Sequence, residues 1–198
     1  MALDKWNKEL EKEIIQKEME SRVFEFKDND RPVYSIDTPP PYINSPVHIG
    51  HASTYSIMDF ISRYKRLKGF NVLFPLGLDR NGLPIEMAAE KKFKISILTT
   101  DRESYIDYCK KILEETSTET SKSFAMLGIS FNTYEETGKI GSVYKTDSEK
   151  YRTLTQETFI ELYKKGLIYL DEKVTNYCPG CKTTLADSEI DYKVVDSK

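Results

Sequence analysis

The chain has 198 residues, a formal net charge of −3 and a hydrophobic content of 39%. This length suits one domain of ordinary size with at most a small appendage, and the apolar content is enough for a core. No apolar run approaches the roughly 18 residues that a membrane span needs, and the charged N-terminus lacks the pattern of a signal peptide. The slight acidity excludes a nucleic-acid footprint over the whole surface. Three cysteines do not make a disulfide framework, so they favour a reducing, cytoplasmic location.

The first elements predicted from the N-terminus are a charged helix and a short strand. Residues 4–22 predict the helix, whose apolar positions Leu10, Ile14 and Ile15 make a narrow stripe. We expect this stripe to pack on the outside of the main fold. Residues 23–31 then predict a strand and a polar turn, with aspartate and asparagine as the turn residues.

A strand–helix–strand unit is predicted next. The runs 33–37 and 71–75 are short and rich in β-branched or aromatic residues, which is typical of buried strands. Between them, apolar residues recur at helical spacing and predict an amphipathic helix; they are Ile57, Phe60, Ile61, Tyr64 and Leu67. Such a unit normally pairs its strands in parallel through a right-handed crossover. Ligands of open α/β sheets bind at the carboxyl ends of strands, so the loops that follow these two strands are the expected sites of chemistry.

The only two histidines of the chain, His48 and His51, lie in the first of these loops. A helix that begins near Gly50 presents unpaired N–H groups and the positive end of its dipole, which favours an anion. Two imidazoles there can donate hydrogen bonds to phosphate oxygens during a transfer reaction, and Gly50 lets the backbone approach a nucleotide closely. The alternative is that both histidines are loop and helix-cap residues.

The second loop, residues 77–84, carries the carboxylate that is best placed to face the strand ends, Asp79. A desolvated carboxylate is the natural charge-assisted partner of the ammonium group of an amino acid. The alternative is a turn aspartate that holds backbone N–H groups. A basic cluster at residues 63–68 ends the intervening helix, and there a solvated helix end is favoured over a phosphate-binding patch.

The second half of the chain predicts two further helices and two strands. Residues 101–127 predict a long helix, with Cys109 as a buried core thiol, and residues 128–132 predict a strand. The apolar face of the next helix is expected to be buried and consists of Tyr151, Leu154, Thr158, Phe159 and Leu162. Gly166 ends that helix, and residues 167–170 predict a strand that leads into a cysteine pair.

Cys178 and Cys181 enclose a tight Pro-Gly turn that can point two sulfur atoms at one metal ion. A structural zinc site needs four ligands, so the pair alone is half of a cage. A redox pair is the alternative, although the motif does not open a helix after a strand as that chemistry prefers.

Several motifs in a fixed order resemble those of class I aminoacyl-tRNA synthetases, within the valine, isoleucine and leucine group. Ser35-Ile-Asp-Thr-Pro-Pro-Pro41 precedes His48-Ile-Gly-His51, and Asp79-Arg-Asn-Gly-Leu-Pro84 follows. Residues 176–189 are similar to the zinc knuckle that opens the editing insertion of the valine and isoleucine enzymes. Trp6, Glu13 and residues 24–26 are similar to their N-terminal helix and first strand. The resemblance covers nearly the whole chain and is strongest to valine enzymes of archaeal type.

The fold that this resemblance implies is α/β, a Rossmann-like nucleotide-binding half with the start of a zinc-knuckle and editing insertion. Residues 1–31 would be the N-terminal helix and strand, 32–166 the N-terminal half of the catalytic domain, and 167–198 the stem of the insertion. The second catalytic signature of the family, Lys-Met-Ser-Lys-Ser, does not occur in the sequence. The chain therefore resembles the N-terminal part of a longer enzyme.

The resemblance also implies residue roles. His48 and His51 would be catalytic and, together with Gly50, would bind ATP. Asp79 would hold the ammonium group of the amino acid. Pro41 and Tyr42 would line the pocket for its side chain.

The activity implied is ATP-dependent activation of valine, with Mg²⁺, and its transfer to tRNA. A second polypeptide is a candidate source of the missing catalytic half, and Cys178 and Cys181 would bind zinc in the full-length protein. Tyr42 is also common in isoleucine enzymes, so an isoleucine-specific ligase is an alternative. A non-catalytic, synthetase-derived nucleotide-binding module is another.

Overall fold

The computed structural model describes residue 5 and residues 7–194, so the predicted role of Trp6 lies outside the described residues. The chain divides into two compact units between Leu154 and Thr155. This division does not test the domain boundaries expected from the sequence, which stay a prediction. Within the described residues, no helix is both long enough and apolar enough to cross a membrane.

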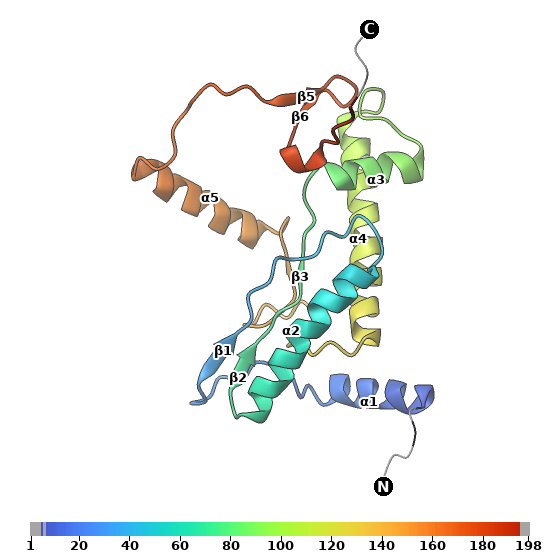
Figure 1. Cartoon of the computed structure of the whole chain (residues 1–198), viewed down its shortest axis with the longest axis vertical. Helices are drawn as coiled ribbons and strands as arrows, with labels where there is room; N and C mark the ends of the chain where they lie inside the picture. Colours follow the sequence, from blue (N-terminus) through green and yellow to red (C-terminus); the bar gives the residue numbers. More distant parts are fainter. Residues whose placement is uncertain (1–4, 6, 195–198) are drawn as a thin grey trace. The chain divides into compact units, whose positions relative to one another are not determined.

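The first unit combines helices with short strands (Figure 1). Its elements are α1 (Lys8–Glu20), β1 (Val33–Ser35), α2 (Ile49–Leu67), β2 (Asn71–Leu73), β3 (Gly77–Leu78), α3 (Leu83–Phe93), α4 (Arg102–Met126), β4 (Tyr144–Lys145) and the start of α5 (Glu149–Lys164). The helix expected over residues 4–22 is confirmed as α1, which Asn7 caps by accepting the N–H groups of Glu9 and Leu10. Helix α1 lies against α4.

The predicted parallel pairing of the first two strands is confirmed. Val33 is opposite Asn71 and Ser35 is opposite Leu73 in a parallel ladder between β1 and β2, and α2 connects the two strands and packs against β2. Just beyond, β3 pairs in parallel with β4, and Tyr42 forms a parallel bridge with Asp79. The loops that follow β1 and β2 therefore meet at the carboxyl ends of the strands, as the sequence predicted.

Two strand predictions in this unit are wrong, and side-chain amides explain both. Residues 23–31 form no strand, because the Asn71 side chain binds both the N–H (3.4 Å) and the carbonyl (2.5 Å) of Lys27 in place of a neighbouring ladder. Residues 128–132 also form no strand, although residues 129–132 are buried. There the Asn132 N–H donates to the Phe74 carbonyl (2.9 Å), while the side chain makes the other bonds.

Asn132 joins three backbone segments in the core. Its Oδ1 accepts the N–H of Phe74 (2.6 Å), and its Nδ2 donates to the carbonyls of Val72 (2.8 Å) and Phe24 (2.8 Å). Gly141 leaves room for this side chain, since a Cβ at Gly141 would lie 2.9 Å from the Asn132 Cβ. One amide thus satisfies buried backbone groups that a regular strand would otherwise pair.

The hydrophobic core lies between α2, α3, α4 and the strands. Its fully buried side chains include Phe74, Phe124, Phe131, Ile43 and Leu76, and Cys109 packs at its edge, half-buried. Burial raises the pKa of the Cys109 thiol, which fits the interpretation of an inert thiol against the core.

The apolar face predicted for α2 is not the buried one. Phe60 and Leu67 are 68% and 87% exposed, and Ile57, Ile61 and Tyr64 are exposed as well. The helix buries Tyr55, Asp59 and Ser62 instead. Asp59 accepts the N–H of Ser130 (2.7 Å), and the Tyr55 ring packs on Phe124 and Phe131. The periodicity of apolar residues therefore identified the opposite side of the helix from the one that is buried.

The second unit contains the rest of α5, then β5 (Asn176–Cys178), β6 (Thr183–Leu185) and the 3₁₀ helix η1 (Asp187–Glu189). The expected burial of one face of α5 is wrong, since no residue of this helix is buried and Phe159 is 56% exposed. Residues 167–170 form no strand either. The strand before the cysteines begins later, at Asn176, and pairs antiparallel with β6.

We predict that Asn132→Ala lowers the free energy of unfolding by about 2–4 kcal/mol, because three backbone groups, two of them buried, lose their partner. Urea denaturation monitored by circular dichroism measures this change. Asn44→Ala is the control, because Asn44 is exposed and its side chain makes no hydrogen bond among the described residues. Equal stability of the two variants would contradict the role of Asn132.

Candidate functional site

His48 is the N-cap of α2. Its backbone is extended (φ −106°, ψ 172°), and its Nδ1 accepts the N–H groups of Gly50 (3.1 Å) and His51 (3.4 Å). A ring nitrogen that accepts these bonds carries no proton, so in the neutral ring the proton is on Nε2. The His48 ring is exposed, and its Nε2–H is therefore a hydrogen-bond donor at the start of the helix.

The two imidazoles are stacked. The ring centroids of His48 and His51 are 3.9 Å apart and the rings are inclined by 19°. Burial, with a smaller contribution from the neighbouring His48, lowers the pKa of His51, and its Nδ1 is buried without a hydrogen-bond partner among the described residues. Both effects disfavour the charged form of the His51 ring.

Gly50 makes room for this arrangement. A Cβ at Gly50 would lie 2.9 Å from Cε1 and 3.0 Å from Nδ1 of His48. The sequence predicted that a nucleotide would approach the backbone at Gly50, but the ring of His48 occupies this space. The two interpretations of the histidines are compatible, because the cap uses Nδ1 of His48 and leaves Nε2 available.

The proline-rich loop and the Asp79 loop are joined by backbone hydrogen bonds. The Asp79 N–H donates to the carbonyl of Pro41 (2.9 Å), and the Ile43 N–H donates to the carbonyl of Asp79 (3.4 Å). Pro41 is buried, while the Tyr42 side chain is 52% exposed. The structure therefore brings together Pro41, Tyr42 and Asp79, the three residues that the sequence assigned to amino-acid binding.

The two oxygens of Asp79 have different surroundings. Oδ1 accepts the N–H of Asn81 (3.3 Å) and the hydroxyl of Thr146 (3.1 Å), as expected of a turn aspartate. Oδ2 accepts no hydrogen bond from any residue that the structure describes. One oxygen thus fixes the loop, and the other remains available to a positively charged group.

Two residues that sequence reasoning missed hold these loops in place. Arg80 is buried and forms ion pairs with Glu114 (2.7 Å) and Asp147 (2.9 Å). The Tyr55 hydroxyl donates to the carbonyl of Pro39 (2.8 Å), which ties the proline loop to α2; burial raises the pKa of Tyr55 to about 12, so the phenol keeps its proton. Neither contact has a local sequence signal, because the partners are distant along the chain.

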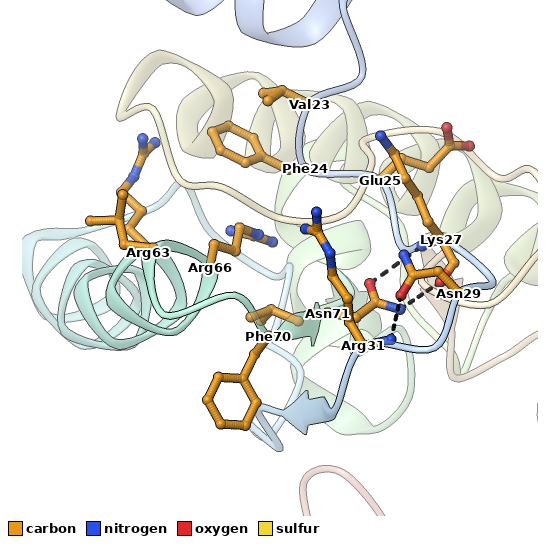
Figure 2. A pocket seen from close by; sticks show the side chains of 12 residues that line it. Val23, Phe24, Glu25, Lys27, Asn29, Arg31, Arg63, Arg66, Phe70 and Asn71 are labelled. Atoms are coloured by element: carbon orange, nitrogen blue, oxygen red, sulfur yellow. Dashed lines mark hydrogen bonds between the residues drawn. The ribbon is translucent and has the colours of Figure 1, made fainter.

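Two arginines of the basic cluster at the end of α2, Arg63 and Arg66, line a cavity of about 400 Å³ near the start of β2 (Figure 2). Arg63 pairs with Asp59 (2.8 Å) and Glu18 (3.4 Å), and its guanidinium also donates to the Gly128 carbonyl (2.6 Å). Arg66 donates to the Ser130 carbonyl (3.0 Å), and burial lowers its pKa to about 10. These two side chains form neither the solvated helix end nor the phosphate-binding patch considered from the sequence. They connect α2 to the segment at residues 128–130 instead.

The cysteine pair lies at the turn between β5 and β6. The N–H of Cys181 approaches Sγ of Cys178 at 3.3 Å, and this contact, with a further one from Gly180, lowers the pKa of the Cys178 thiol. No third histidine, cysteine or acidic residue joins these thiols in the part of the chain that the structure describes. Two donors do not fit a closed zinc site, which needs four.

The histidines and the proline-rich loop belong to the motifs that resemble class I synthetases in sequence, and the comparison with known families agrees. Residues 6–197 match the family described as tRNA synthetases class I (I, L, M and V). The chain belongs to this family.

Within this family, the chain is similar to valine–tRNA ligases of archaea. The chain is 42% identical to a valine–tRNA ligase of Pyrobaculum aerophilum over 96% of its length, and 39% identical to that of Methanocaldococcus jannaschii over 98%. It is 44% identical to the valine–tRNA ligase of Nanoarchaeum equitans over 94%. It spans only 23%, 21% and 24% of these relatives.

A solved structure shares the fold. It is a ternary complex of Agrobacterium radiobacter K84 agnB2 LeuRS with tRNA and LeuAMS, which matches with a TM-score of 0.70 and 28% identity. The match covers 89% of this chain and 20% of that one. The Rossmann-like α/β fold class predicted from the sequence is therefore confirmed.

We predict that the stability of the chain falls as the pH is lowered below about 6.5, the ordinary pKa of histidine. The unfolded chain takes up a proton on His51 near that pH, whereas the folded chain, in which this pKa is lowered, resists protonation. Melting temperatures measured between about pH 7.5 and 5.5 test this expectation. His51→Gln should flatten the pH dependence, and an unchanged slope in this variant would contradict it.

Proposed function

We propose that this chain forms the amino-acid-activating part of a valine–tRNA ligase. The observation that carries the proposal is the site itself, in which the capped imidazole pair and the Pro41–Asp79 pairing both follow the carboxyl ends of parallel strands. The identity to valine–tRNA ligases over nearly the whole chain supports it. A cytoplasmic location is part of the proposal.

The reaction proposed is attack of a valine carboxylate oxygen on the α-phosphorus of ATP. A new phosphorus–oxygen bond gives valyl-adenylate, and the bond to the β-phosphate breaks to release pyrophosphate. The Nε2–H of His48 and the N-terminal end of α2 would stabilise the negative charge on the phosphate oxygens as it shifts in the transition state. His51, stacked on His48, would keep that donor oriented, and Gly50 would contribute to ATP binding by leaving room for the His48 ring at the start of the helix.

The amino acid would be held by the loop that follows β2. Asp79 Oδ2 would accept a hydrogen bond from the ammonium group, while Pro41 and Tyr42 would border the side-chain pocket. Isoleucine is the alternative substrate, because it differs from valine by one methylene group, which an apolar pocket distinguishes by only about 10- to 200-fold.

The exposed apolar face of α2 supports a further component of the proposal. Phe60, Leu67 and their neighbours form a contiguous helical stripe at the surface of the first unit. A stripe of this kind on a helix normally packs against another element. We infer that the rest of a nucleotide-binding fold covers it, supplied by a longer polypeptide or by a second one, and that the assembled protein transfers valine to tRNA.

The proposal includes Mg²⁺ but not zinc. Mg²⁺ would accompany ATP as part of the substrate. Cys178 and Cys181 alone do not fit a zinc site, so no role is assigned to zinc here.

Valine-dependent ATP–pyrophosphate exchange tests the proposal. The chain is assayed alone and mixed with a polypeptide covering the remainder of a valine–tRNA ligase, with valine, isoleucine, leucine and threonine in parallel. We expect exchange only in the mixture and fastest with valine. Fastest exchange with isoleucine would establish the alternative, and no exchange in the mixture would contradict an activating role.

In the active mixture, His48→Ala should reduce kcat about 100-fold with little change in the KM for valine, because the donor acts in the transition state. Asp79→Asn should mainly raise the KM for valine. Asp107→Asn is the matched control, since Asp107 is an exposed carboxylate on α4 whose one ion pair within the described residues is with Lys110 (3.6 Å). Equal kinetics of the Asp79 and Asp107 variants would remove Asp79 from the site.

A further inference from the structure

Tyr144 begins β4 and lies directly opposite Gly77 in the parallel ladder with β3. Its N–H donates to the Leu76 carbonyl (3.1 Å), which fixes the backbone at this position. Gly77 is two residues before Asp79. Tyr144 is therefore placed beside the loop that carries the proposed ammonium-binding carboxylate, although no sequence motif marks it.

The phenol ring of Tyr144 lies over the Cα of Gly77. A Cβ at Gly77 would be 2.3 Å from Cζ and 2.4 Å from Oη of Tyr144. These two atoms are the hydroxyl end of the ring, so the hydroxyl itself crosses the strand at Gly77. A glycine is required there because any side chain would displace the phenol.

The same face of the sheet carries Asp79. Alternate residues of a strand point to one face, so positions 77 and 79 share a face, as do positions 144 and 146. Thr146 confirms this arrangement, since its hydroxyl donates to Asp79 Oδ1 (3.1 Å). The Tyr144 hydroxyl consequently lies over the strand that leads to Asp79, at the position of Gly77.

The surroundings of the hydroxyl are negatively charged. Burial raises the pKa of Tyr144, and Tyr151 and the carboxylates of Asp37 and Asp79 raise it further. The phenol is therefore neutral, and the two carboxylates make this place favourable to a cation. Its hydroxyl makes no hydrogen bond among the described residues, while stacking on Tyr151 (centroids 6.0 Å apart, rings within 3°) restrains the ring.

We propose that Tyr144 is an amino-acid-binding residue whose hydroxyl oxygen accepts a hydrogen bond from the substrate ammonium group next to Asp79. The ammonium group has three N–H donors. Asp79 Oδ2 takes one of them and Tyr144 Oη takes another. This inference rests on the proposed function, because it requires that an amino acid occupies the site at Asp79.

The test is Tyr144→Phe, which removes the hydroxyl and keeps the ring. Binding of valine and of 3-methylbutanamide, which keeps the side chain but lacks the ammonium group, is measured by NMR titration of the whole chain. We expect valine to bind about ten-fold more weakly to the variant and the amide to bind equally well, because only the ammonium group uses the hydroxyl. The melting temperature should stay unchanged.

Tyr151→Phe is the matched control, since it removes the hydroxyl from the other ring of the stacked pair. It should bind valine as the unchanged chain does. Equal valine affinity of the Tyr144→Phe variant and the unchanged chain would overturn the inference and leave the proposed function intact, as would equal losses for valine and the amide. No binding of valine by the unchanged chain would overturn the proposed amino-acid site and this inference with it.

Discussion

A buried guanidinium holds the loop on which the proposed site depends. Arg80 is 6% exposed and lies between Asp79, which faces the site, and Asn81, whose N–H closes the turn. A charge at this depth is stable only when it is paired. Its partners Glu114 and Asp147 come from α4 and from the segment after β4, so three distant parts of the chain must converge before the loop is fixed.

The same convergence aligns the hydrogen bonds around Asp79. The N–H of Arg80 and the side-chain amide of Asn81 both donate to the hydroxyl oxygen of Thr146 (2.9 Å each), and this hydroxyl donates to Asp79. The Thr146 hydroxyl therefore accepts from Arg80 and Asn81 and has its proton directed at Asp79. The orientation of the proposed ammonium-binding carboxylate is thus set by the loop before a substrate arrives, which lowers the entropic cost of binding.

Local patterns predicted much of this architecture. The β-branched runs at residues 33–37 and 71–75 contain strands, the long helix over 101–127 forms, and Pro41, Tyr42 and Asp79 come together as their positions after two parallel strands required. These features succeed because each depends on residues that are close in sequence, together with one general rule about where the ends of parallel strands meet.

The helix faces were predicted wrongly because hydrophobic periodicity identifies a face without identifying its partner. Helix α2 buries Asp59 and Ser62 because Ser130 offers them hydrogen bonds, and its apolar side is left exposed. Asn71 and Asn132 replace strand pairing by side-chain amides, so the segments they bind look like strands in sequence and are not. Arg80 and Tyr144 gain their roles only from contacts across the fold.

The crowding at the start of α2 also constrains how this family can change through evolution. The imidazole of His48 occupies the space that a side chain at position 50 would need, and its Nδ1 uses the backbone N–H groups of positions 50 and 51. A side chain at position 50 would therefore displace the ring that caps the helix. Positions 48 and 50 are therefore coupled, and a residue larger than glycine at position 50 requires a smaller, oxygen-bearing cap at position 48.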